Sequence, residues 1–130
     1  VPEVVEWNRG PLASFADHPL DDERTELVQG DVTEVIRNAH NEFDAIMLDV
    51  DNGPSPIVDE RNGWLYTDPG LQAIRRALKN GGKVAIWSAD DEPKFPGRMR
   101  RNGFRADRHR VRTHKGKGGI RHVIFTGRKA

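Results

Sequence analysis

Acidic side chains follow two apolar stretches of this chain, at the point where each stretch ends. Asp49 and Asp51 come after the run 45–48, and a second group, residues 90–92, comes after the stretch 83–88. Carboxylates that lie close together repel one another, so such a group disfavours folding unless a cation or a hydrogen-bond donor lies among them. A cationic amine, a metal ion or the hydroxyl groups of a ribose could each bind between the carboxylates and offset this repulsion. If the two stretches are neighbouring parallel strands, these acids lie in the crevice where open α/β sheets bind ligands.

The apolar stretches have the length and composition of strands. Residues 45–48 (AIML) end in an acidic turn with Asn-Gly-Pro, which predicts a strand buried on both faces in the middle of a parallel sheet. Residues 83–88 predict a second such strand, and residues 26–29 (ELVQ) predict a short earlier one. Together they predict a sheet whose acidic edge is a candidate ligand site.

Helix signals separate the predicted strands. Pro2 suits the first turn of a helix, and Asp31 precedes a second helix with Glu34 at the spacing of a capping box. Asp68, followed by proline, is predicted as the N-cap of a third helix, which the sequence Asn-Gly-Gly at 80–82 is predicted to end. The connection 51–67 is long for a compact domain, which is typical of a binding loop.

The last third of the chain predicts a weaker helix, residues 93–102, followed by two strands, residues 104–113 and 120–126, that pair as an antiparallel hairpin. The alternation of helices and strands predicts an α/β fold, with a layered and mostly parallel sheet that the C-terminal antiparallel hairpin closes. A chain of 130 residues has the size of a single domain, so we expect residues 1–130 to form one.

The composition excludes several classes of site. The chain has no cysteine, which rules out disulfides and cysteine-ligated metals, and its five histidines lack the spacing of a zinc site. We therefore expect no metal. The apolar runs are too short to cross a bilayer, and no signal segment opens the sequence, so we expect a cytoplasmic protein without a membrane partner.

The charge is divided unevenly along the chain. Residues 1–93 carry 8 Lys and Arg against 19 Asp and Glu, whereas residues 94–130 carry 13 against 1. The basic segment is a candidate nucleic-acid-binding surface. The alternative is that its arginines are solvated or pair with the acidic part of the chain. The candidate residues are Arg98, Arg100, Arg101, Arg105, Arg108, Arg110, Arg112, Lys115 and Lys117.

Three segments together resemble the spermidine synthase family of aminopropyltransferases: ELVQGDVTEVI, FDAIMLDVDNGP and WLYTDPGLQAIRRALKNGGKVAIWSA. The resemblance runs from the first helix to at least Ala89 and implies the Rossmann-like fold of class I S-adenosylmethionine-dependent methyltransferases. It also implies an N-terminally truncated domain that lacks the first two strands of that sheet. A sheet edge exposed in this way invites association, so a homo-oligomer through that edge is expected.

The resemblance assigns roles to residues that follow the predicted strands. Asp31, with Gly30, would hold the adenine amino group of decarboxylated S-adenosylmethionine, and Asp49 would contact the same nucleoside. Asp49 would also help to deprotonate the attacking amine, because an amine must be neutral to act as a nucleophile and a carboxylate can accept its proton. The implied function is a spermidine synthase-like transferase that acts on a small amine.

Asp51 and Asn52 stand where the family has the end of a D-x-x-D-P loop, with Asp51 as a displaced substitute for the second aspartate. Asp51 is therefore a second candidate catalytic residue, and Asp51, Asn52 and Tyr66 are candidates for binding the amine. Two alternatives remain open. The donor could be S-adenosylmethionine, with methyl transfer to a small molecule, and one form of that reaction would place a metal at Asp49 and Asp90.

Overall fold

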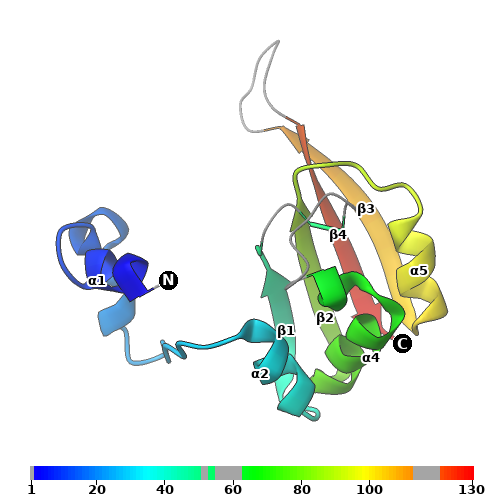
Figure 1. Cartoon of the computed structure of the whole chain (residues 1–130), viewed down its shortest axis with the longest axis horizontal. Coiled ribbons are helices and arrows are strands. Elements are labelled where there is room, and N and C mark those ends of the chain that lie inside the picture. Colours follow the sequence, from blue (N-terminus) through cyan, green and yellow to red (C-terminus); the bar gives the residue numbers. More distant parts are fainter. Residues whose placement is uncertain (1, 51–52, 55–62, 113–120) are drawn as a thin grey trace. The chain divides into compact units, whose positions relative to one another are not determined.

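The computed structural model describes residues 2–50, 53–54, 63–112 and 121–130 (Figure 1). The chain divides into two compact units, Val1–Asp31 and Val32–Ala130, and each is described here by itself. The single domain over residues 1–130 stays a prediction. None of the helices in the described ranges is long and apolar enough to cross a membrane.

The first unit consists of helix α1 (Pro2–Arg9) and two short 3-10 helices, η1 (Ala13–Ala16) and η2 (Pro19–Asp21). The Arg24 guanidinium donates hydrogen bonds to both carboxylate oxygens of Asp22, at 2.9 and 2.7 Å, and holds the pKa of Asp22 below its usual value. The strand predicted at residues 26–29 is wrong, because this stretch has no regular secondary structure and pairs with no strand in the described part of the chain. Its side chains Leu27 and Val28 are 40% and 63% exposed.

The second unit contains a four-stranded mixed sheet, as far as the described residues go. Strand β1 (Phe43–Leu48) pairs in parallel with β2 (Leu78–Ser88), and β2 pairs antiparallel with β4 (Arg121–Lys129). Strand β4 in turn pairs antiparallel with β3 (Phe104–Arg112), which gives the order β1-β2-β4-β3. The α/β class and the C-terminal antiparallel hairpin are therefore confirmed.

Helices cover one face of this sheet. Helices α2 (Val32–Asn38), α4 (Asp68–Ala77) and α5 (Phe95–Arg101) pack on it (Figure 1). Apolar side chains of the helices and strands form one buried cluster between the two layers. Its fully buried members include Leu71, Ile74, Ile86, Phe95, Met99 and Phe125.

Strand β1 differs from its prediction in two respects. It lies at an edge of the sheet formed by the described residues, and only alternate side chains are buried. Ile46 and Leu48 face the helices, whereas Met47 between them is 83% exposed. The prediction of a central strand buried on both faces is therefore wrong, because the second face of β1 is covered by none of the described residues.

The N-cap of helix α4 lies one residue earlier than predicted. The N-cap is Thr67, whose extended backbone lets its hydroxyl accept the N–H of Gly70 at 3.3 Å. Asp68 is the first helical residue, and its carboxylate instead accepts a hydrogen bond from the Asn102 amide at 2.7 Å. Asp68 thus links the start of α4 to the residue that ends α5.

Helix α4 also ends before the predicted stop. Its last carbonyls, on Arg76 and Ala77, accept the N–H groups of Asn41 and Glu42 at 2.9 and 2.8 Å, so the turn before β1 caps the helix. The Asn-Gly-Gly sequence lies instead in an irregular part of β2, where the pairing with β1 shifts register. Gly81 has a φ of +75° there, a conformation that glycine adopts without strain.

Candidate functional site

Asp49 follows the carboxyl end of β1 and is exposed to solvent. It makes no ion pair with any other residue in the described ranges. Asp51 and Asn52, predicted to lie beside it, fall outside the described residues. Because β1 and β2 are parallel, Asp49 lies at the same end of the sheet as the acids that follow β2. The predicted meeting of the two strand ends is therefore confirmed.

Tyr66, in the 3-10 helix η3 (Trp64–Tyr66), anchors the chain next to Asp49. Its side chain is buried, with 3% of the residue exposed, and its hydroxyl donates a hydrogen bond to the Val50 carbonyl at 3.1 Å. Its ring packs edge-on against Phe95, with 6.0 Å between the ring centroids. Tyr66 thereby fixes the backbone of the residue that follows Asp49, whereas its contact with an amine substrate stays a prediction.

Gly53 fixes the other side of the same turn. Its φ is +87°, and a Cβ atom built on it would lie 2.4 Å from the hydroxyl oxygen of Ser88. The backbone at Gly53 therefore rests directly on the last residue of β2, and only glycine allows so close an approach. The buried Ser88 hydroxyl donates to the Asp90 carbonyl at 2.7 Å, which carries the same support into the turn after β2.

One of the acids after β2, Asp91, is paired within the protein. Arg108 donates to one carboxylate oxygen of Asp91 at 3.0 Å, and Arg110 donates to the other at 3.2 and 2.9 Å. Both arginines lie on β3, two positions apart, so their side chains leave the strand on the same face. The alternative in which basic residues pair with the acidic part of the chain therefore holds for Arg108 and Arg110.

Two other arginines of the candidate nucleic-acid surface also hold local structure. Arg98 donates to the Tyr66 carbonyl at 3.1 Å, and Arg100 donates to the Ala106 carbonyl at 2.7 Å. The two lysines of that set lie outside the described residues. A nucleic-acid function stays a prediction, but these contacts give Arg98 and Arg100 a structural role without it.

Gly30 and Asp31 end the first unit, and Asp31 comes directly before α2, at the position that the capping-box spacing predicts. Asp49 belongs to the second unit, so the proximity of Asp31 to Asp49 stays a prediction. Within the described ranges, no group of three or more histidine, aspartate or glutamate side chains is arranged to hold a metal ion.

Sequence reasoning missed the contact between Gly53 and Ser88, and it predicted the pairing of Asp91 only in general terms, as the alternative in which the basic segment pairs with the acidic part of the chain. The close contact between Gly53 and Ser88 leaves only a weak signal in the sequence, which is a glycine directly after the acidic turn. The pairing of Asp91 with β3 has a stronger one, because Arg108 and Arg110 alternate along a predicted strand.

A parallel strand pair with an exposed aspartate at the carboxyl end of its first strand, followed by an antiparallel hairpin, is the arrangement of a methyltransferase-like α/β domain. A spermidine synthase solved with the transition-state analogue AdoDATO superposes with a TM-score of 0.74 over 98% of this chain and 43% of that chain, at 24% identity. A precorrin-6y C5,15-methyltransferase from Geobacter metallireducens superposes with a TM-score of 0.64 over 100% of this chain and 64% of that chain, at 17% identity. At such identities the likeness shows the fold.

The sequence comparisons narrow this class to one family. The model of the spermine/spermidine synthase domain matches residues 2–94, and the chain belongs to that family. A polyamine aminopropyltransferase of Saccharolobus islandicus is 30% identical over 93 residues, which are 72% of this chain and 29% of that protein. Another, from Thermotoga petrophila, is 37% identical over 76 residues, 58% of this chain and 23% of that protein. The chain therefore spans about 29% of the length of the first of these relatives.

Proposed function

We propose that this chain provides the amine-activating part of an aminopropyl transfer reaction, in which the donor is decarboxylated S-adenosylmethionine and the acceptor is a small linear amine. The observation that carries the proposal is Asp49, an exposed carboxylate at the carboxyl end of β1 in a turn held by Tyr66 and Gly53. Membership of the spermine/spermidine synthase family supports the choice of reaction.

In the proposed reaction the nitrogen lone pair of the neutral amine attacks the propyl carbon bonded to the sulfonium sulfur. A carbon–nitrogen bond forms, the carbon–sulfur bond breaks, and its electron pair returns to sulfur, which leaves as a neutral thioether. The proton lost by the amine goes to the Asp49 carboxylate, which acts as general base. Since the sulfonium is already a good leaving group, most of the rate comes from the orientation of amine and donor.

The remaining predicted contacts complete the proposal. Gly30 and Asp31 hold the adenosine part of the donor, while Asp51, Asn52 and Tyr66 act on the amine side. A S-adenosylmethionine-type ligand is supported by two solved structures of this fold. One is the spermidine synthase with AdoDATO, and the other is a methyltransferase of Burkholderia thailandensis with bound S-adenosylhomocysteine, at 18% identity and a TM-score of 0.59. We also propose that the protein is cytoplasmic. We propose further that two copies of the chain associate through the exposed edge of strand β1.

Methyl transfer from S-adenosylmethionine is the second candidate function. The superposition of methyltransferases on most of this chain favours it. The two functions differ in the product that the donor leaves behind, which is methylthioadenosine for aminopropyl transfer and S-adenosylhomocysteine for methyl transfer.

The test is to incubate the purified chain with 1,4-diaminobutane and either donor, and to identify the products by mass spectrometry. Calorimetry measures the binding of each donor in parallel. We expect methylthioadenosine and the aminopropylated diamine from the decarboxylated donor. Release of S-adenosylhomocysteine instead would favour methyl transfer, and a chain that neither binds nor converts either donor would overturn both functions.

A further inference from the structure

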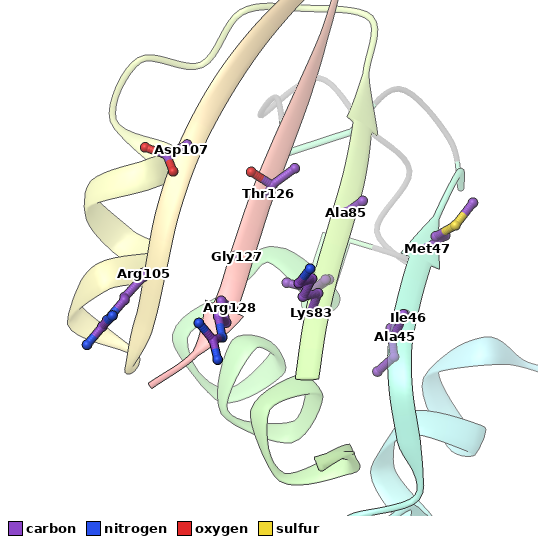
Figure 2. Close-up of a pocket in the computed structure, with 11 residues that line it drawn as sticks. Ala45, Ile46, Met47, Lys83, Ala85, Arg105, Asp107, Thr126, Gly127 and Arg128 are labelled. Carbon is purple, nitrogen blue, oxygen red and sulfur yellow. The ribbon is translucent and has the colours of Figure 1, made fainter. Parts of the chain in front are cut away.

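The turn after β1 is supported from the helix-covered side of the sheet. On the opposite face, residues of all four described strands line a pocket of about 440 Å³ (Figure 2), and Met47 is the lining residue closest in sequence to Asp49. Val50, directly after Asp49, packs instead against the buried cluster between the sheet and the helices. The backbone beside Asp49 is therefore in contact with the helical layer, which decides what can hold this carboxylate in place.

Helix α5 holds Tyr66 at two points. The Arg98 guanidinium donates to the Tyr66 carbonyl at 3.1 Å, and the Phe95 ring packs edge-on against the Tyr66 ring. Arg98 and Phe95 are three residues apart in α5, so both side chains leave the helix on the same face. Phe95 makes a further edge-on contact with Phe125 of β4, with 5.1 Å between the ring centroids. Tyr66 is thus held against the buried core of the second unit.

The short helix that contains Tyr66 gives it little support of its own. A 3-10 helix of three residues, such as η3, has few hydrogen bonds, and their geometry is poor. The Tyr66 hydroxyl, at the other end of the residue, donates to the Val50 carbonyl next to Asp49. A shift of the Tyr66 backbone would therefore strain or break the bond to Val50. Arg98 is well suited to prevent such a shift, because a hydrogen bond from a charged donor is roughly twice as strong as a neutral one.

We propose that Arg98 acts as a positioning residue: through Tyr66 it holds the turn that contains Asp49, without touching the substrate itself. Its kinetic effect rests on the proposed function, in which Asp49 is the general base. The family model matches residues 2–94, so that match assigns no role to α5. A half-buried guanidinium that is bound to a carbonyl is also less available to phosphate groups, which argues against Arg98 as part of a nucleic-acid surface.

The kinetic test uses the full chain and Arg98→Met, which keeps a long side chain and removes its donors. Arg100→Met is the matched control, because Arg100 lies on the same helix and donates to the Ala106 carbonyl at 2.7 Å, away from the turn. We expect Arg98→Met to lower kcat by about tenfold, since a displaced base loses its alignment with the amine. The KM for the amine should stay within about twofold of the parent value, because no substrate contact is lost. Arg98→Lys, which keeps a charged donor, should recover part of the rate, and Arg100→Met should keep the parent kcat.

A double variant separates positioning from a general loss of stability. It combines Arg98→Met with Tyr66→Phe. If both residues act through the same turn, their effects are not independent, and the double variant should be within about twofold of Arg98→Met alone. Effects on kcat that multiply would overturn the role of Arg98. Equal kcat values for Arg98→Met and Arg100→Met would overturn it as well.

A structural measurement keeps this inference distinct from the proposed reaction. Carbon-detected NMR follows the Val50 carbonyl signal, which reports the hydrogen bond from Tyr66. We expect Arg98→Met to shift this signal and Arg100→Met to leave it unchanged. Such a shift in a chain that releases no methylthioadenosine would overturn the proposed function and keep Arg98 as the residue that holds the turn. An unchanged Val50 signal would overturn the role of Arg98, whether or not the chain is active.

Discussion

The turns after β1 and β2 each place a charged aspartate at the same end of the sheet, but the two carboxylates differ in whether the protein itself neutralises them. After β2, Asp91 lies between Arg108 and Arg110, and its side chain is only 30% exposed. After β1, Asp49 is exposed and has no ionic partner in the part of the chain that the structure describes. One carboxylate is neutralised by the fold, while the other remains available to a cation from outside.

The difference teaches which of the acids can do chemistry. A carboxylate that already accepts hydrogen bonds from two guanidinium groups has little capacity left for a substrate ammonium or for its proton. Asp49 keeps that capacity, and the structure supports its turn through the backbone rather than through its side chain, by Tyr66 at Val50 and by Ser88 at Gly53.

Asp49→Asn tests the difference between the two carboxylates most strongly, because it removes the one that we propose acts as the general base. We expect transfer to fall by about 10²–10⁴-fold, the usual loss when a general base is removed. Asp44→Asn is the matched control, because Asp44 is exposed on the same strand and pairs with Lys79 at 2.9 Å. The measurement is the initial rate of methylthioadenosine release. Unchanged turnover by Asp49→Asn would remove Asp49 from the reaction.

Gly53→Ala tests whether the close packing of the Gly53 backbone on Ser88 is needed for the reaction. The added Cβ would collide with Ser88 and favour a different φ, so the turn must shift. We expect transfer to fall by about 10²-fold through misplacement of Asp49, and stability to fall by about 1–3 kcal/mol. Gly63→Ala is the control, because Gly63 has a φ of −55° and open space around its Cβ position. Equal rates for the two variants would contradict the role of this contact.

Tyr66→Phe removes one hydroxyl and keeps the ring against Phe95. Loss of the hydrogen bond to the Val50 carbonyl should cost about 1 kcal/mol, which corresponds to about a fivefold fall in kcat if the turn loosens. The kcat and KM for the amine, measured together, distinguish two roles. A rise in KM alone would indicate that the hydroxyl contacts the substrate instead of supporting the turn.

Asp91→Asn should have the smallest effect on transfer. It weakens the ionic contacts of Arg108 and Arg110, so we expect the free energy of unfolding to fall by roughly 1 kcal/mol, with the rate of transfer unchanged. Urea unfolding and the product assay, performed on the same preparation, provide both numbers. A large loss of transfer with unaltered stability would mean that the two acidic turns share the chemistry.

Much of the second unit could be predicted from local sequence. The apolar runs before Asp49 and in residues 83–88, the helix that follows Thr67 and the alternating C-terminal hairpin all carry periodicities that their surroundings do not override. Residues 26–29 carry a strand-like pattern too, yet a strand forms only where another strand supplies hydrogen bonds, and the pattern does not contain that information.

The errors in the site have the same origin. The apolar run of β1 predicted burial on both faces, but the exposure of Met47 depends on what packs against the sheet rather than on the strand itself. Likewise, the ion pairs of Asp91 depend on the register of a hairpin that begins 13 residues later in the chain. Local sequence could predict the acids and not their partners.

The central claim is that Asp49, after β1, is open to a cationic amine and that Asp91, after β2, is not. Carbon-detected NMR of the aspartate carboxyl groups, during a titration with 1,4-diaminobutane at constant ionic strength, tests it directly. We predict a saturable shift of the Asp49 carboxyl signal and no shift of the Asp91 signal. A saturable shift at Asp91, or none at Asp49 at any diamine concentration, would contradict the account.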